Sequence, residues 1–352
     1  MVCLILEKNS LQEMGMLWKW SKRIGLGLLC LIAVMLLAGA SYQFISTKLD
    51  ESRYPPPGQM VDVGGYRLHL HSMGIGGPTV VLDAGLGNIG VDWGLVQPEI
   101  AKFTQVVTYD RAGTGWSDKG PQPRTSAQIV QELHTLLHAA NVPGPYIIVG
   151  HSFGGGNAQL FAATFPEEVL GVVLVDACHE AQERRMPPNP MEGSLMQKPI
   201  MVRLASTLGV NRLLVNMYTK GTTPPVPQPM WDTHMALCLT TKHWCSMYDE
   251  VGVFTMSLKQ LEEANWSALA QKPCIVITAG LLPDLSALGV DENLKNYMEE
   301  SIVVWNELQK ELVAKFRDGR QVIAEKSDHM IPFHQPEVIV QAVQEIIEGN
   351  KQ

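Results

Sequence analysis

Charge is scarce in this sequence, and basic residues are fewer than acidic ones. Only 18% of the 352 residues are charged, and the formal net charge is −8. Nucleic-acid binding needs a basic surface that contacts phosphates, so this composition argues against DNA or RNA as a partner. The 46% hydrophobic content is enough for a large core in one elaborated domain or two.

Closely spaced cysteine pairs are also missing. The six cysteines include no Cys-x-x-Cys sequence, so neither a zinc site nor a dithiol redox site is indicated. Cys238 and Cys245 could form a disulfide if this part of the chain is exported, and two buried thiols fit the sequence equally well.

No charged residue occurs between Arg23 and Lys48. A stretch of roughly 20 apolar residues spans a bilayer, so we predict a transmembrane anchor at 24–45. Basic residues precede it, which places residues 1–23 in the cytoplasm and the rest of the chain, after the anchor, on the extracytoplasmic side. Alternatively, the segment is a signal peptide cleaved after Ala40, and the protein is secreted. Residues 46–58, which contain three consecutive prolines, are predicted to form a stiff linker.

One short stretch carries a specific chemical signal. The apolar run 146–149 ends at Gly150, and Gly150-His151-Ser152-Phe153-Gly154 precedes a stretch with helical spacing of apolar residues. A strand, a sharp turn with Gly-x-Ser-x-Gly and a helix form a nucleophile elbow. Ser152 is therefore the candidate nucleophile. The glycines leave room for the turn, and the positive end of the helix points at the developing oxyanion.

The remaining chain alternates strands and helices around this elbow. Strands are predicted near 60–71 (a hairpin), 79–83, 105–110, 169–176, 272–280 and 321–324, and helices at 125–140, 292–316 and 336–348. This order predicts an α/β fold with a mostly parallel, doubly wound sheet. Residues 178–270 break the alternation and are predicted to be a helical cap, so that 59–177 and 271–352 form the core. The Met and Leu residues of the cap either line an apolar pocket or form its own core.

The catalytic partners of Ser152 are expected on loops at the carboxyl ends of strands. His329 follows the last strand and is the candidate base, and Asp284 follows a late strand and is the candidate acid. Asp176, at the end of the strand after the elbow, is the rival acid, and Glu292 is a third choice. The backbone N–H groups of Leu86 and Phe153 are candidates for the oxyanion hole.

For other polar residues near these loops we predict roles outside the catalytic chemistry itself. Asp110 and Arg111 are expected to pair with each other and to brace a glycine-rich loop beside the site. His151 should point away from Ser152, His179 is a candidate for substrate contact, and His334 is expected at the surface.

At these residues the chain resembles the α/β-hydrolase superfamily. The resemblance covers roughly residues 59–349 and rests on three motifs. They are Gly150-His151-Ser152-Phe153-Gly154-Gly155, Tyr109-Asp110-Arg111-x-Gly-x-Gly-x-Ser-Asp, and Ser327-Asp328-His329 with Pro336-Glu337 behind. The chain departs from the family pattern in two places. Ala84-Gly85 replaces the common His-Gly before the oxyanion residue, and Asp284 lies one position later than usual after its glycine.

The resemblance implies a membrane-anchored serine hydrolase with a small, apolar ester as substrate. It implies no metal and no organic cofactor. Two other functions stay open: a non-catalytic binding module on the same fold, and cofactor-free haloperoxidase or carbon–carbon hydrolase chemistry with the same triad.

Overall fold

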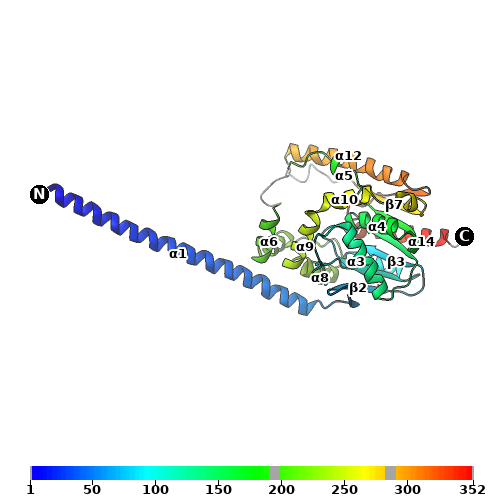
Figure 1. Cartoon of the computed structure of the whole chain (residues 1–352), viewed down its shortest axis with the longest axis horizontal. Coiled ribbons are helices and arrows are strands. Elements are labelled where there is room, and N and C mark those ends of the chain that lie inside the picture. The colour runs from blue at the N-terminus through cyan, green and yellow to red at the C-terminus, as the bar shows by residue number, and fades with distance from the viewer. Residues whose placement is uncertain (1, 191–197, 282–290, 351–352) are drawn as a thin grey trace.

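A computed structural model describes residues 2–190, 198–281 and 291–350. These residues form one eight-stranded sheet with helices on both faces (Figure 1). The strands are β1 (Gln59–Asp62), β2 (Arg67–Met73), β3 (Thr79–Asp83), β4 (Val106–Tyr109), β5 (Tyr146–His151), β6 (Val169–Val175), β7 (Cys274–Ala279) and β8 (Gly319–Ala324). Their spatial order is β1-β2-β4-β3-β5-β6-β7-β8. The pairs β1–β2 and β2–β4 are antiparallel, and all others are parallel, as predicted.

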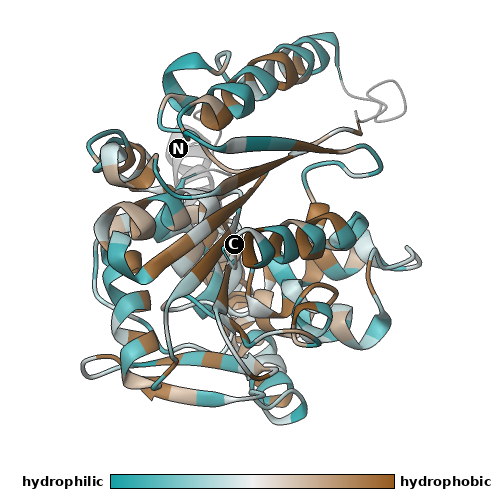
Figure 2. Cartoon of the chain, turned by 90° about the vertical axis from the view of Figure 1, so that its right-hand side faces the viewer, coloured by the Kyte–Doolittle hydropathy of each residue, from teal (hydrophilic) through white to brown (hydrophobic). Residues whose placement is uncertain are grey.

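The central strands are apolar on both faces because helices cover both (Figure 2). Adjacent residues of β3 belong to different cores: Val81 packs with Leu133 and Phe161, whereas Val80 packs with Ile339 and Val343. The first core lies under α3 (Ser126–Ala139), α4 (Phe153–Thr164) and α12 (Glu292–Ala314). The second lies under α2 (Gln97–Ile100) and α14 (Pro336–Gly349). Three further short helices are η1 (Gly90–Trp93), η2 (Pro166–Glu168) and α13 (Ile331–His334).

The described part of 178–270 contains helices and no strand. They are α5 (Gln182–Arg185), α6 (Pro199–Thr207), α7 (Val210–Thr219), α8 (Gln228–Cys238), α9 (Thr241–Val251), α10 (Phe254–Glu262) and α11 (Trp266–Leu269). Within the predicted cap, residues 201–214 have continuous helical spacing of apolar residues but belong to two helices, because Gly209 has a φ of +71° and ends the first. Helices α10 and α11 pack against α4, so we use the term cap helices for α5–α9. The limits of the cap remain a prediction.

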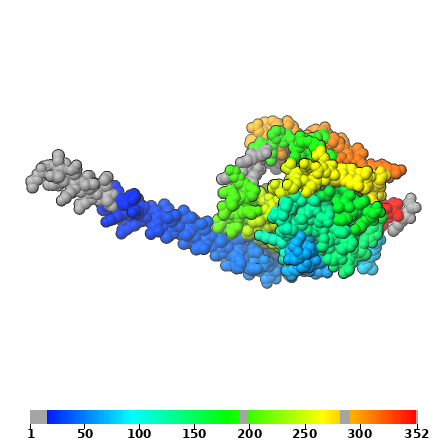
Figure 3. All heavy atoms as spheres, in the orientation of Figure 1, coloured from blue at the N-terminus to red at the C-terminus, as the bar shows by residue number. Residues whose placement is uncertain are grey.

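The amino-terminal helix α1 (Val2–Arg53) is continuous and projects from the rest of the chain (Figures 1 and 3). Its part Met16–Arg53 is long and apolar enough to cross a membrane. The helix continues through 46–53, so this part of the predicted stiff linker is helical, and the limits of the linker remain a prediction. The carboxyl-terminal part of α1 packs against α6 and α8.

Five cysteines are free thiols: Cys30, Cys178, Cys238, Cys245 and Cys274. Cys238 is buried and Cys245 is half-buried, and neither forms a disulfide. The sequence allowed either a disulfide or two thiols at Cys238 and Cys245, and the structure shows two thiols.

Candidate functional site

Ser152 lies on a strained turn between β5 and α4. Its φ of 53° and ψ of −119° are unusual for a residue with a side chain, and such conformations cost roughly 1–3 kcal/mol. The two motif glycines make the turn possible. A Cβ at Gly150 would lie 2.2 Å from the Gly154 carbonyl oxygen, and one at Gly154 would lie 2.4 Å from that of Asp83. The predicted strand, turn and helix are confirmed.

Ser152 and His329 line the same cavity, whose volume is about 490 Å³. His329 comes from the loop after β8, and its Nδ1 lies 2.6 Å from Oδ2 of Asp176. The imidazole is 46% exposed, whereas the Asp176 side chain is 2% exposed. A buried carboxylate therefore holds one ring nitrogen of a histidine whose other face is open to the cavity.

Asp176 directly follows β6 and is fixed by two further donors. Its Oδ1 accepts hydrogen bonds from the backbone N–H of Ala279 at 3.1 Å and from Nε1–H of Trp305 at 2.9 Å. Three donors thus satisfy a buried carboxylate and set its orientation. Trp305 was not singled out from the sequence, because a tryptophan in an amphipathic helix is indistinguishable there from a core residue.

The acid preferred from the sequence, Asp284, lies outside the described residues. The rival acid, Asp176, is the carboxylate that contacts His329. Glu292 is an exposed residue at the start of α12.

The two candidate oxyanion donors lie on the turn after β3 and at the start of α4. In the part of the chain that the structure describes, neither Leu86 N–H nor Phe153 N–H has a protein acceptor. Both groups are therefore free to donate to a bound oxygen atom.

A buried arginine braces the turn that carries Leu86. Arg111 donates to the carbonyl oxygens of Ala84 at 2.6 Å and Gly85 at 2.8 Å. It also forms ion pairs with Asp83 at 3.0 Å and with Glu250 of α9 at 2.9 Å. Arg111 therefore links the turn that carries Leu86 to the cap helix α9.

The expected pair of Asp110 with Arg111 is wrong, although both residues brace loops. Asp110 contacts Nδ1 of His69 at 3.0 Å and accepts from the backbone N–H groups of Gly90 at 2.8 Å and Trp116 at 3.0 Å. These three contacts hold the Asp110 carboxylate, and the Arg111 guanidinium forms its ion pairs with Asp83 and Glu250 instead.

His151 supports the loop of His329. Its Nε2 lies 2.8 Å from the His329 carbonyl oxygen, which can only accept, so this nitrogen carries the proton. Burial, followed by the nearby His329, lowers the pKa of His151 to about 4. His151 is thus a neutral donor near neutral pH.

The other two histidines differ in environment. His179 is buried, and its Nδ1 accepts a hydrogen bond from the Ala181 N–H at 3.1 Å. His334 is exposed, as expected, and its Nδ1 lies 2.8 Å from Oδ1 of Asp328.

The cavity wall is largely apolar. Its lining includes Met186 from the end of α5, Leu281, Ile302 and Trp305, and Met330 beside the base. Met186 is one of the cap methionines expected to line a pocket, whereas Met217 is exposed. Met191 and Met196 lie outside the described residues.

The structure also contains one cluster that could hold a metal ion, within the described ranges. It consists of His134, His138 and Glu168 and lies apart from the Ser152 cavity.

Comparison with known proteins supports the fold. A family model described as "alpha/beta hydrolase fold" matches residues 78–221. A Hormonema carpetanum protein named "Probable transporter efuK" is 26% identical over 82% of this chain and 42% of its own length. An "AB hydrolase superfamily protein" of Gibberella zeae is 23% identical over 77% of this chain and 86% of its own length. The chain spans less than half of several curated relatives, 42% of efuK and 42% of a Bacillus subtilis protein.

Solved structures show the same fold at low identity. A thermophilic esterase from Thermogutta terrifontis aligns with a TM-score of 0.56 and 16% identity over 82% of this chain and 96% of its own. The enol-lactonase from Burkholderia xenovorans aligns with a TM-score of 0.57 and 16% identity over 82% and 100% of the two chains.

Proposed function

The chain belongs to the α/β-hydrolase superfamily, and from this we propose that it is a membrane-anchored serine hydrolase that cleaves apolar acyl esters. The observation that carries the proposal is the cavity shared by Ser152 and His329, with Asp176 bonded to the imidazole. Esterases and a lactonase among the structural neighbours support ester-type substrates.

In the proposed reaction, Ser152 Oγ attacks the ester carbonyl carbon while Nε2 of His329 takes the serine proton. The carbonyl oxygen becomes an oxyanion, to which the N–H groups of Leu86 and Phe153 donate. His329 then protonates the leaving alkoxide, which leaves an acyl-serine. Water, deprotonated by His329, attacks the acyl carbon, and the proton returns to Ser152 as the acid product departs.

We assign the orienting acid to Asp176. Its contact with Nδ1 of His329 leaves Nε2 as the ring nitrogen that is free to take the serine proton, and its negative charge stabilises the imidazolium. The hydrogen bonds from Ala279 and Trp305 fix the carboxylate in that position.

The membrane part of the proposal rests on α1. The span is apolar, and Lys19, Lys22 and Arg23 precede its charge-free stretch. By the positive-inside rule the catalytic domain then lies on the extracytoplasmic side. Gln43, beyond the possible cleavage site at Ala40, donates to the Leu239 carbonyl oxygen at 2.8 Å. The interaction of α1 with the cap therefore extends past that site.

Labelling with a fluorophosphonate probe tests the nucleophile and the base. We expect an adduct on Ser152 of the full chain in detergent, and its loss in Ser152→Ala and His329→Ala. His334→Ala is the matched control, because His334 is a nearby histidine that also pairs with an aspartate. Ester turnover should fall roughly 10⁴-fold or more in the first two variants and persist in the control. Absence of an adduct in folded protein would contradict the mechanism and favour a binding module.

Acyl chain length tests the apolar substrate. With p-nitrophenyl esters from acetate to octanoate, kcat/KM should rise with each added methylene, since each buried CH₂ contributes about 0.8 kcal/mol. A flat or falling series would contradict an apolar acyl site and leave the serine mechanism intact.

A further inference from the structure

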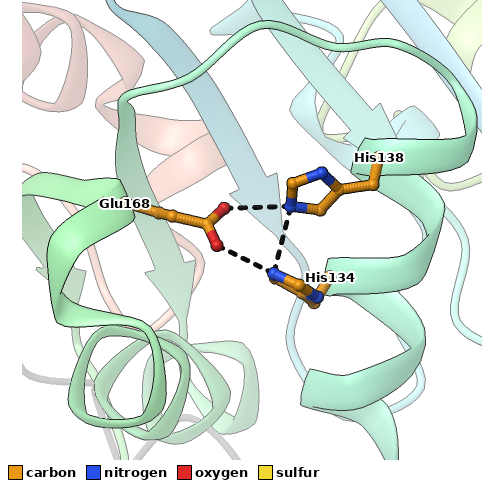
Figure 4. A group of neighbouring side chains, drawn as sticks. All are labelled: His134, His138 and Glu168. Atoms are coloured by element: carbon orange, nitrogen blue, oxygen red, sulfur yellow. Dashed lines mark hydrogen bonds and ion pairs between the residues drawn. The ribbon is translucent and has the colours of Figure 1, made fainter.

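Three metal-binding side chains converge between α3 and η2 (Figure 4). His134 and His138 are one helical turn apart on α3, and Glu168 is the last residue of η2. Nε2 of His134 lies 2.9 Å from Oε1 of Glu168, and Nε2 of His138 lies 3.1 Å from Oε2. The two Nε2 atoms are 3.1 Å apart.

Protons alone do not explain these contacts. The carboxylate can only accept hydrogen bonds, so contacts to both nitrogens require a proton on each Nε2. Two N–H donors would then face each other at 3.1 Å with no acceptor between them. Zinc binds imidazole nitrogen and carboxylate oxygen at about 2.0–2.2 Å, so the ligand atoms of a tetrahedral site lie roughly 3.3–3.6 Å apart, a few tenths of an ångström more than these atoms do. We propose that His134, His138 and Glu168 bind one Zn²⁺ or a similar divalent transition metal ion.

A neighbouring aromatic ring fixes one of the three side chains, and the other two are accessible to solvent. The His134 ring stacks on Phe165, with centroids 3.8 Å apart and planes inclined by 10°. His138 is 57% exposed and Glu168 is 32% exposed, so solvent reaches the site and supplies the fourth ligand. Three protein ligands and one water molecule complete a tetrahedral zinc site.

The position of the site indicates a structural role. Glu168 directly precedes β6, whereas Asp176 directly follows it. The metal site and the Ser152 cavity therefore lie at opposite ends of the same strand. A bound ion would tie α3 to the start of β6 and would take no part in ester cleavage.

Calorimetric titration of the metal-free full chain with ZnCl₂ at pH 7.5 tests the site. We expect one equivalent to bind, with affinity reduced at least tenfold in His138→Ala and in Glu168→Gln. His334→Ala is the matched control and should bind as the unaltered chain does. Zinc should also raise the Tm of the unaltered chain and leave the rate of Ser152 labelling unchanged.

Two results would overturn the metal site. One is a folded protein that binds no zinc. The other is binding of equal strength in His138→Ala and Glu168→Gln, which would place the ion elsewhere. Both variants change exposed side chains, so circular dichroism can verify that they fold.

A second, independent observation concerns the surface of the cap next to α1. Helices α6 and α7 expose seven large apolar side chains: Ile200, Leu204, Val210, Leu213, Leu214, Met217 and Tyr218. A soluble surface seldom gathers so many in one place. A Cβ at Gly39 of α1 would lie 2.7 Å from the carbonyl oxygen of Leu208, which joins the two helices. The apolar face is thus fixed beside the charge-free part of α1.

We infer that this face of α6 and α7 inserts into the lipid leaflet next to α1. The inference rests on the anchoring proposed above, because a membrane that contains the charge-free part of α1 must also meet the helices packed against it. Amphipathic helices bind such interfaces through the apolar area that they bury in lipid.

Fluorescent amino acids placed singly in the full chain, in vesicles containing brominated lipids, test this inference. A reporter at Met217 should be quenched, and one at Ile75, which is 89% exposed on the loop before β3, should not. A third reporter at Leu31 monitors α1. Quenching at 31 but not at 217 would overturn lipid insertion of the cap and keep the anchor. Absence of quenching at both positions would overturn the anchor itself.

Discussion

Asp176 and Asp284 can be separated by matched substitutions. Asp176→Asn keeps the size of the side chain but removes the charge that stabilises the His329 imidazolium. We expect kcat for ester hydrolysis to fall by roughly 10⁴-fold. Asp284→Asn should lower it less than tenfold, because Asp176 already occupies Nδ1 of the base. Steady-state kinetics of both variants provide the measurement, and the reverse pattern would return the role to Asp284.

His151 makes stability depend on pH. Its pKa is about 4 in the folded protein and about 6.5 when unfolded. The unfolded chain therefore binds the proton first as pH falls below 6.5, and His151 loses its stabilising contribution down to pH 4, by about 1.4 kcal/mol per pH unit. His179, whose pKa is also lowered to about 4 by burial, acts in the same direction.

His151→Gln should flatten this dependence, because the amide can still donate to the His329 carbonyl oxygen but does not titrate. Urea unfolding of both proteins between pH 4 and 7 gives the two slopes. Equal slopes would show that another group is responsible.

At the scale of elements, Arg111 joins the turn after β3 to α9. Arg111→Met would leave the buried carboxylates of Asp83 and Glu250 without a cationic partner, although Asp83 would keep its hydrogen bond from Asn157. We expect the free energy of unfolding to fall by about 3–5 kcal/mol. The control is Arg67→Met, which removes a partly exposed pair with Asp118 and should cost no more than about 1 kcal/mol. Denaturant titrations measure both, and similar losses would contradict the bracing role.

The sequence was most informative where a pattern reflects burial by an adjacent layer. The strands around Ser152 and the amphipathic helices at 125–140 and 336–348 were predicted because hydrophobic periodicity records which face is covered. The break at Gly209 was missed because apolar residues continue on both sides of it. Here a backbone conformation, and not periodicity, ends the helix.

The site was predicted only in part, for a geometric reason. Strands β6 and β7 are parallel neighbours, so residues directly after them belong to the same sheet edge. In the sequence Asp176 follows β6 and Asp284 follows β7, but Asp284 lies outside the described residues. Chain order alone cannot decide which carboxylate reaches His329. Trp305 and Arg111 act through contacts with residues distant in sequence, which no local pattern records.

At the scale of the whole molecule, Arg212 connects α1 to the cap. It is buried and contacts Oδ2 of Asp50 at 2.6 Å, Oε1 of Gln43 at 3.2 Å and the Leu239 carbonyl oxygen at 3.3 Å. Arg212→Ala should speed hydrogen exchange in 46–53 by about tenfold or more, since hydrogen bonds to charged groups contribute about 1.5–3 kcal/mol.

Arg203→Ala is the control for this effect, because Arg203 is a half-exposed cap residue that pairs with Asp249 of α9. Exchange in 46–53 should stay unchanged in this variant. Equal acceleration in both variants would indicate general loosening of the cap and not a specific joint with α1.

The joint between α1 and the cap has a kinetic consequence. A domain on a flexible linker samples every orientation above a membrane. Here α1 continues to Arg53 as one helix, and it is hydrogen-bonded to the cap. In the anchored protein the mouth of the cavity would then keep a nearly constant height and tilt over the lipid headgroups. Turnover of a lipid-dissolved ester would follow its mole fraction in the bilayer, and diluting the membrane with inert lipid would slow the enzyme at constant bulk concentration.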